Sequence, residues 1–256
     1  MGQTSAFLCR INDFRRRVVA RAHSESICGI CRCKIKDNTL FTSLSDAELD
    51  LFKDVVTTSF HRKKEVVFME GDECGGLYII RVGRVKLVRT SKGGKEQIIK
   101  IVGPGDLLGL EVFYEGKSYE NSAIAMEDAD LCYVRKSDFF GLLEKKPEIA
   151  RKLITSLGKE LHHAYEKIGH LGLMNAKEKL AHLLYTLAGE YGVPYNKGVR
   201  LYLKMSRLEI AGLLGITQET SIRLLKGFKE EGILDIKRKE ISITSMERLA
   251  EIGGIL

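Results

Sequence analysis

The chain has 256 residues, 44% of them hydrophobic, and a formal net charge of +7 with an isoelectric point near 9.0, which suits a polyanionic partner. This length favours two domains over one, and the apolar content is sufficient for packed cores. No apolar run approaches the ~18 residues of a membrane span, and residues 1–27 lack the apolar stretch of a secretory signal, so we expect a cytoplasmic protein without membrane contact.

The N-terminal segment is polar and basic, and it leads into a group of crowded cysteines. This group comprises three cysteines that are close in sequence, Cys28, Cys31 and Cys33. Structural disulfides are not expected among them in a reducing cytosol. Clustered cytosolic thiols are typical of metal binding or of redox sensing. Residues 42–52 then predict an amphipathic helix, with Ser45 as its N-cap and Glu48 completing a capping box.

From about residue 58 to 136, short β-favouring runs alternate with glycine-containing turns. Several short strands at regular spacing predict a compact barrel or roll. We expect strands over residues 65–69, 76–81, 84–89, 97–102 and 129–134.

After Pro147 the pattern becomes helical, with apolar residues at alternating spacings of four and three. Such a heptad pattern requires a partner helix. The partner is either the chain's own roll or, as we favour, the same helix of a second chain. The predicted dimer seam comprises Ile154, Leu157, Leu161, Ala164, Ile168 and Leu171.

The C-terminal part predicts a helix from Asn175, a break at residues 192–198, and then a helix-turn-helix with a basic two-stranded wing at residues 233–243. Leu208, Ala211 and Leu214 of the first helix are expected to face the second, and Gly215 supplies the turn. The leading end of a second helix enters the major groove of DNA in this motif, although a plain helical hairpin has the same periodicity. The candidate DNA-binding residues are Thr217, Gln218, Glu219, Ser221, Ile222 and Arg223.

The order of these segments resembles the Crp–Fnr family of bacterial transcription regulators over roughly residues 28 to 245. The motifs that carry the resemblance are residues 68–80 (FMEGDECGGLYII), 103–109 (GPGDLLG), 175–181 (NAKEKLA) and 218–223 (QETSIR). It implies an α+β chain with an antiparallel β-roll similar to cyclic-nucleotide-binding domains, a long dimerisation helix and a C-terminal winged helix-turn-helix. We therefore expect an arm at 1–39, a sensor roll at 40–146, a dimerisation helix at 147–173 and a DNA-binding domain at 174–256.

The resemblance also indicates what the roll does not bind. In the cyclic-AMP branch of the family an arginine in an Arg-Ser-Ala segment holds the phosphate, but here that position is Asn121. A buried phosphate needs a compensating cation with bidentate donors, which asparagine does not supply. Cyclic AMP is therefore not the expected ligand, although Glu111 lies one position from the glutamate of that branch.

The Fnr branch holds an iron–sulfur cluster with three N-terminal cysteines and one cysteine in the roll. By resemblance, the ligands of a [4Fe–4S] cluster here are Cys28, Cys31, Cys33 and Cys132. The Cys-x-x-Cys-x-Cys spacing is shorter than the branch's own, which leaves Cys9 as an alternative to Cys33. Zinc on the same thiols and thiol oxidation without any cluster also remain open.

The other sensor chemistries are a haem and a small organic effector. Candidate axial ligands for haem are His23, His61, His162, His163, His170 and His182, and none has a pattern that singles it out. No nucleophile–base pair, HExxH or Walker loop is present, so catalysis is not expected. The resemblance implies three partners, namely a palindromic double-stranded DNA site, a second copy of the chain and RNA polymerase.

Overall fold

A computed structural model describes residues 51–255 except Lys53 and residues 115–116, 196–197 and 238–239, and it leaves the side chains of Lys167, His170 and Leu171 undescribed. The predicted cluster ligands Cys28, Cys31 and Cys33, and the alternative ligand Cys9, lie outside these residues. So does most of the helix expected over 42–52.

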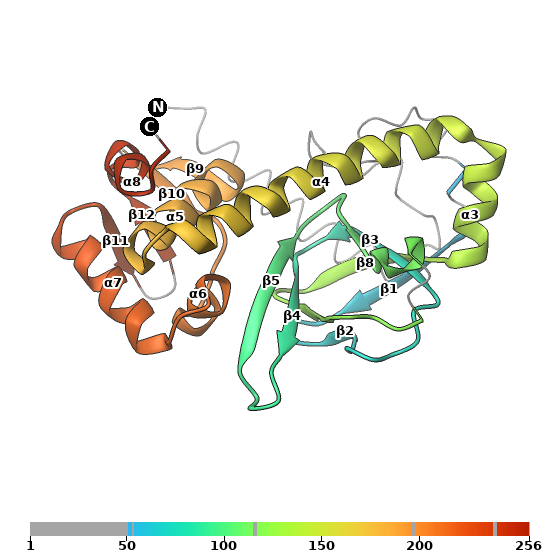
Figure 1. The fold of residues 1–256 in the computed structure, drawn as a ribbon, viewed down its shortest axis with the longest axis horizontal. Helices are drawn as coiled ribbons and strands as arrows, with labels where there is room; N and C mark the ends of the chain where they lie inside the picture. Colours follow the sequence, from blue (N-terminus) through green and yellow to red (C-terminus); the bar gives the residue numbers. More distant parts are fainter. Residues whose placement is uncertain (1–50, 53, 115–116, 196–197, 238–239, 256) are drawn as a thin grey trace.

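The N-terminal part of the described chain is a roll of two antiparallel four-stranded sheets, on the right of Figure 1. One sheet has the order β1-β8-β3-β6 and the other β2-β7-β4-β5. The strands are β1 Val56–His61, β2 Val66–Phe68, β3 Gly76–Val82, β4 Val85–Thr90, β5 Glu96–Val102, β6 Leu107–Leu108, β7 Ser122–Ala125 and β8 Ala129–Arg135. All five expected strands are present, and β1, β6 and β7 were not predicted.

The turn between β3 and β4 shows why glycine recurs in this part of the chain. Gly83 has φ of 84°, and a Cβ at this position would lie 2.6 Å from the carbonyl oxygen of Asp128. Only glycine tolerates both the left-handed backbone and this close approach. The turn therefore depends on this residue.

Helices cover one side of the roll, and the last of them extends beyond it. After the short η3 (Leu110–Phe113) come α3 (Lys136–Lys145) and α4 (Pro147–Leu173), and α4 crosses from the roll to the C-terminal part (Figure 1). Phe139 of α3 and Ile149 and Leu153 of α4 are buried in the roll's core. Farther along, Lys100 of β5 donates to Glu160 of α4 at 2.6 Å, which fastens the middle of the helix to the roll.

The C-terminal part combines four helices with a small antiparallel sheet of order β11-β12-β10-β9. Its elements are α5 Ala176–Tyr191, β9 Gly192–Tyr195, β10 Gly198–Leu201, α6 Arg207–Leu214, α7 Gln218–Glu230, β11 Leu234–Lys237, β12 Glu240–Ile243 and α8 Met246–Ile252. The segment predicted as a break therefore forms the hairpin β9–β10. The α+β class expected from the sequence is confirmed.

Two hydrophobic cores stabilise the molecule, and the second extends across the domain junction. It contains Leu180, Leu184 and Phe228 of the C-terminal part together with Val88 and Ile98 of the roll. The roll's β4–β5 hairpin thus shares apolar packing with the helix-turn-helix. No helix in the described part of the chain is long and apolar enough to cross a membrane.

Candidate nucleic-acid interface and sensor site

The two helices of the helix-turn-helix begin and end with well-formed caps. Ser206 accepts a hydrogen bond from the Glu209 amide at 3.1 Å, while the Glu209 carboxylate accepts from the Ser206 amide at 2.7 Å. This capping box satisfies two orphan amides of α6. Gly215 ends α6 in the left-handed region, with φ of 69°. The turn has the geometry that a helix-turn-helix requires.

Helix α7 divides into a buried face and an exposed face. Gln218, Glu219, Ile222 and Arg223 are exposed, as expected of residues that meet DNA. Thr217 is the N-cap, and its hydroxyl accepts from the Thr220 amide at 3.2 Å. This cap holds the Thr217 side chain in place at the start of α7. The N-terminus of a helix can also bind a phosphate.

Ser221 does not belong to the exposed set, and its assignment to the DNA surface was wrong. Its side chain is fully buried, on the same face as Leu225 and Phe228. The spacing of four and three along α7 accounts for this, because these positions lie on one side of a helix. The expected inward orientation of Leu208 was also wrong, since that residue is 61% exposed.

The wing is the hairpin β11–β12, which follows α7, the second helix of the helix-turn-helix. Lys237 is exposed, and its ammonium lies 4.0 Å from Asp235, which also pairs with Lys229 at 3.0 Å. The hydrogen bond from Lys229, helped by the hydrogen bond from the Ile236 amide and by the charge of Lys229, holds the pKa of Asp235 below its ordinary value. Arg238 and Lys239, at the predicted tip of the wing, lie outside the described residues.

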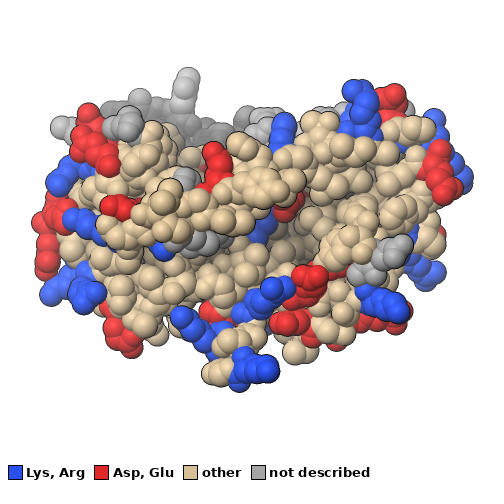
Figure 2. Space-filling view, in the orientation of Figure 1, with Lys and Arg blue, Asp and Glu red and all other residues tan. Residues whose placement is uncertain are grey.

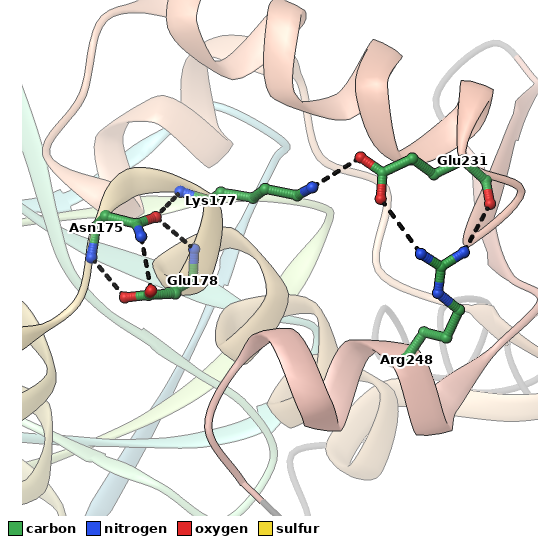
Figure 3. Close-up of polar contacts among 5 residues, drawn as sticks. All are labelled: Asn175, Lys177, Glu178, Glu231 and Arg248. Carbon is green, nitrogen blue, oxygen red and sulfur yellow. Dashed lines mark hydrogen bonds and ion pairs between the residues drawn. The ribbon is translucent and has the colours of Figure 1, made fainter.

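A polar cluster joins the start of α5 to the end of α7 (Figure 3). Asn175 caps α5 and forms a capping box with Glu178. The Lys177 ammonium donates to the Glu231 carboxylate at 2.7 Å, and Arg248 of α8 donates to the Glu231 carbonyl at 3.2 Å. Glu231 therefore connects the first helix of this domain, the recognition helix and the last helix.

The heptad positions of α4 form an exposed apolar stripe along most of their length. Ile154, Leu161 and Ile168 are 69%, 52% and 65% exposed, and Ala164 is exposed as well. Leu157 is half-buried against the roll's core. The side chain of Leu171 is not described. Exposed apolar residues in a row are typical of an interface with another chain. Tyr165, which the heptad pattern did not include, adds to this surface at 64% exposure.

Cys132, the expected distant cluster ligand, lies in the central strand β8 and is fully buried. Across the ladders it stands opposite Thr58 of β1 and Ile79 of β3. Side chains alternate along a strand, so Cys132 points away from the face that carries Tyr133. Tyr133 contacts Tyr78 and, through it, Phe68 of the opposite sheet, so its face is the roll's interior. The thiol therefore lies on the outer face, the side covered by α3 and the start of α4.

Comparisons with known proteins agree with this arrangement. Residues 59–146 match the model of the cyclic nucleotide-binding domain, and residues 178–252 match that of the Crp-like helix-turn-helix domain. The chain is 32% identical to the anaerobic regulatory protein of Aggregatibacter actinomycetemcomitans over 223 residues, which cover 87% of this chain and 86% of that one. It is 29% identical to the fumarate and nitrate reduction regulatory protein of Escherichia coli K12, over 93% and 96% of the two chains.

The structure of FixK2 from Bradyrhizobium japonicum superposes with a TM-score of 0.68 at 29% identity, covering 77% of this chain and 97% of that one. The chain belongs to the Crp–Fnr family. It is a DNA-binding transcription regulator and not an enzyme, as the sequence predicted.

In this Crp–Fnr regulator, aromatic side chains fill the interior of the roll. Tyr119 stacks on Phe68 with ring centroids 3.8 Å apart, and its hydroxyl donates to the carbonyl of Gly76 at 3.0 Å. Burial, followed by the charge of Glu111, raises the pKa of the neighbouring Cys74 thiol. The sequence did not predict this packed interior.

The described histidines of this regulator do not converge on a common centre. His61 is hydrogen bonded to Ser59 at 3.1 Å, and His162 and His163 are exposed on α4 beside Glu166. His23 and the side chain of His170 are not described. Within residues 51–255, apart from the gaps named above, no three His, Cys, Asp or Glu side chains form a group able to hold a metal ion.

Proposed function

We propose that this regulator responds to oxygen, nitric oxide or redox state through a [4Fe–4S] cluster held by Cys28, Cys31, Cys33 and Cys132. A cluster of this type takes four thiolates, and its iron chemistry supplies the reactivity toward these small oxidants. The position of Cys132 is the observation that carries the proposal. A cysteine that serves only for packing can lie in the interior of the roll, whereas Cys132 lies on the outer face of its sheet.

The surroundings of Cys132 suit a ligand contributed to a shared centre. Thr58, its neighbour across the β1–β8 ladder, is exposed, and so is Phe60 on the same face of β1. Directly opposed side chains have Cβ atoms about 5 Å apart. The three proposed thiols of the N-terminal segment would then approach the buried sulfur from the β1 side.

The same position favours a link between the sensor and the long helix. Cys132 shares one core with Phe139 of α3 and with Ile149 and Leu153 of α4. Cores are closely packed, so a change in the ligands around this sulfur alters how α4 is seated on the roll. The seam on α4 then pairs less well with a second chain.

We infer that the working form is a homodimer on a palindromic operator. The exposed stripe of Ile154, Leu161 and Ile168 supports pairing of the two α4 helices. Pairing sets the two α7 helices at one-turn spacing, about 34 Å, which is the separation of successive major grooves. On each half-site, Arg223 is placed to donate to guanine O6 and N7, and Glu219 to accept from cytosine N4. We further propose RNA polymerase as a partner at the promoter.

Iron and acid-labile sulfide analysis of anaerobically purified protein tests the proposal. We expect about four irons per chain and absorbance near 400 nm. Cys132→Ala should lose both, whereas Cys74→Ala, which removes a buried thiol from the roll's interior, should keep both. Far-UV circular dichroism establishes that the two variants are equally folded. Colourless, iron-free wild-type protein that binds its operator at full strength would contradict the proposal.

A further inference from the structure

The β4–β5 hairpin of the roll is seated on the first helix of the helix-turn-helix. The side-chain amide of Gln97 donates to the carbonyl oxygen of Gly212 at 2.5 Å. This carbonyl is near the C-terminal end of α6, where main-chain acceptors lack partners within the helix. Ile98, the next residue of β5, is buried against the same helix.

Two glycines on the helix-turn-helix form the surface that receives the hairpin. A Cβ at Gly212 would lie 3.2 Å from Cγ1 of Ile98, and one at Gly215 would lie 3.3 Å from Oε1 of Gln97. A side chain at Gly212 would require Ile98 to shift by a few tenths of an ångström, and one at Gly215 would be strained by the left-handed backbone there. The hairpin is thus held beside Gly215, two residues before the N-cap of the recognition helix.

The tip of this hairpin is a hydrogen-bonded turn that carries uncompensated positive charge. The Ser91 amide donates to the Lys95 carbonyl at 2.9 Å, and the Gly94 amide donates to the Ser91 carbonyl at 2.8 Å. Lys92 and Lys95 are exposed, and neither has an ion-pair partner among the described residues. The other cations of the hairpin are paired, Lys86 with Glu96, Arg89 with Glu120 and Lys100 with Glu160.

The tip points to the same side of the molecule as the turn that delivers α7. In Figure 1 the hairpin projects past α6 at the lower edge, and Figure 2 shows Lys and Arg side chains on this projection. Lys95 is two residues from Gln97, about 7 Å along a strand. An extended lysine side chain adds about 6 Å, so the Lys95 ammonium can extend about 13 Å from Gln97.

We propose that the β4–β5 tip is a second DNA contact, in which Lys92 and Lys95 bind phosphates that flank the half-site contacted by α7. The roll, and not only the helix-turn-helix, then adds to operator affinity. Duplex DNA presents about one negative charge per 1.7 Å of its axis, so a basic projection beside the recognition helix meets phosphates as the duplex continues past the half-site. Gly93 and Gly94, between the lysines, have no side chains and so allow the protein main chain to approach the DNA phosphates closely.

Charge favours DNA over a protein partner at this site. The tip has no exposed apolar side chain between Thr90 and Glu96, whereas stable protein interfaces have an apolar centre. Phosphate contacts require only cations and amides. They contribute affinity without base preference, so the tip is expected to act equally on every operator sequence.

The test compares two double variants that remove the same charge. Lys92→Gln/Lys95→Gln neutralises the tip, and Lys145→Gln/Lys146→Gln neutralises two exposed lysines at the end of α3, on the far side of the roll (Figure 1). Operator affinity is measured between about 50 and about 200 mM salt. Two DNA fragments are used, one ending at the half-sites and one extended by about ten base pairs on each side.

On the extended fragment we expect the tip variant to lose about 2 from the log–log salt slope for each bound protomer. Over this fourfold salt range, the wild type should lose about tenfold more affinity than the variant for each protomer. The α3 variant should match the wild type, and all three proteins should bind the short fragment alike.

Three results would overturn the proposal. They are an unchanged salt slope in the tip variant, an equal change in the α3 variant, and an equal loss on both fragments. An unchanged slope together with lost transcription in a reconstituted system would assign the tip to an acidic protein surface instead of DNA.

Discussion

Gln97 of the roll donates its side-chain amide to the main-chain carbonyl of Gly212 in α6, a direct bond between the roll and the C-terminal part. The two parts are also connected through α4, so the chain has two physical connections between the roll and the helix-turn-helix. The contact through Gln97 is short, and the next residue, Ile98, packs beside Gly212 in a hydrophobic core shared by the roll and the C-terminal part.

Gln97→Ala should loosen this junction without unfolding either domain. Loss of one such hydrogen bond costs about 1 kcal/mol, which corresponds to roughly fivefold faster amide exchange in β5 and α6. Hydrogen exchange with mass spectrometry measures this effect. Thr90→Ala, an exposed change on the same hairpin, is the control and should leave exchange in α6 unchanged. If both variants exchange like the wild type, the bond does not hold the junction.

Ser221 and Arg223 should separate stability from base preference. Arg223→Ala should cost about 1–3 kcal/mol at a single base pair and relax discrimination there. The hydroxyl of Ser221 is buried and has no hydrogen-bond partner among the described atoms. Ser221→Ala should therefore keep or raise the melting temperature and leave base preference unchanged, because removing an unsatisfied polar group is favourable. Binding to an operator library, with a thermal melt of each variant, measures both effects.

Ala164 should permit dimerisation of the metal-free protein. Alanine at this exposed seam position brings no charge to the interface, whereas Ala164→Asp would place two carboxylates opposite each other and shift the equilibrium toward monomer. Sedimentation velocity at micromolar concentration is the measurement. Thr155→Asp, an exposed change on α4 outside the seam, should leave the dimer intact. A clean monomer in the metal-free wild type would refute this expectation.

Alkaline solution should destabilise the roll. Burial raises the pKa of Cys74 above 9.0 and the pKa of Tyr119 above 10.0, their ordinary values. The unfolded chain therefore releases these protons first, so these two groups leave the stability unchanged below about pH 9 and lower it as pH rises further. Each group contributes up to about 1.4 kcal/mol per pH unit. Urea unfolding from pH 8 to 11 measures how steeply the free energy of unfolding falls with pH. Tyr119→Phe should make this fall less steep by the contribution of one titrating group.

The sequence predicted the larger elements of this fold because their patterns are long. The helix α4 follows from its heptad periodicity, and the five predicted strands and the turn at Gly215 follow from β-favouring runs and glycine positions. The missed strands have local reasons. Strand β6 has only two residues, and β7 (Ser122–Ala125) consists largely of small residues. Pro194 made β9 resemble a break, and proline is tolerated there because β9 is an edge strand.

The candidate sites were less predictable than the fold. Residue type suggested that Ser221 faces DNA, but the shared helical face with Leu225 and Phe228 was the stronger signal. The seat of the β4–β5 hairpin on Gly212 joins positions 115 residues apart, and no local pattern reports such a contact. The aromatic interior around Tyr119 likewise arises only when the two sheets face each other.

The joint at Asn175 has a consequence for how this regulator can vary in length. Two non-helical residues separate α4 from α5, and the caps of Asn175 and the bond from Lys177 to Glu231 fix the second helix rigidly to its domain. One residue inserted into α4 would turn everything after it by about 100° around the helix axis. In a symmetric pair, both DNA-contacting faces would then swing away from the same side of the duplex. Insertions and deletions at this connection should therefore be tolerated far less than substitutions.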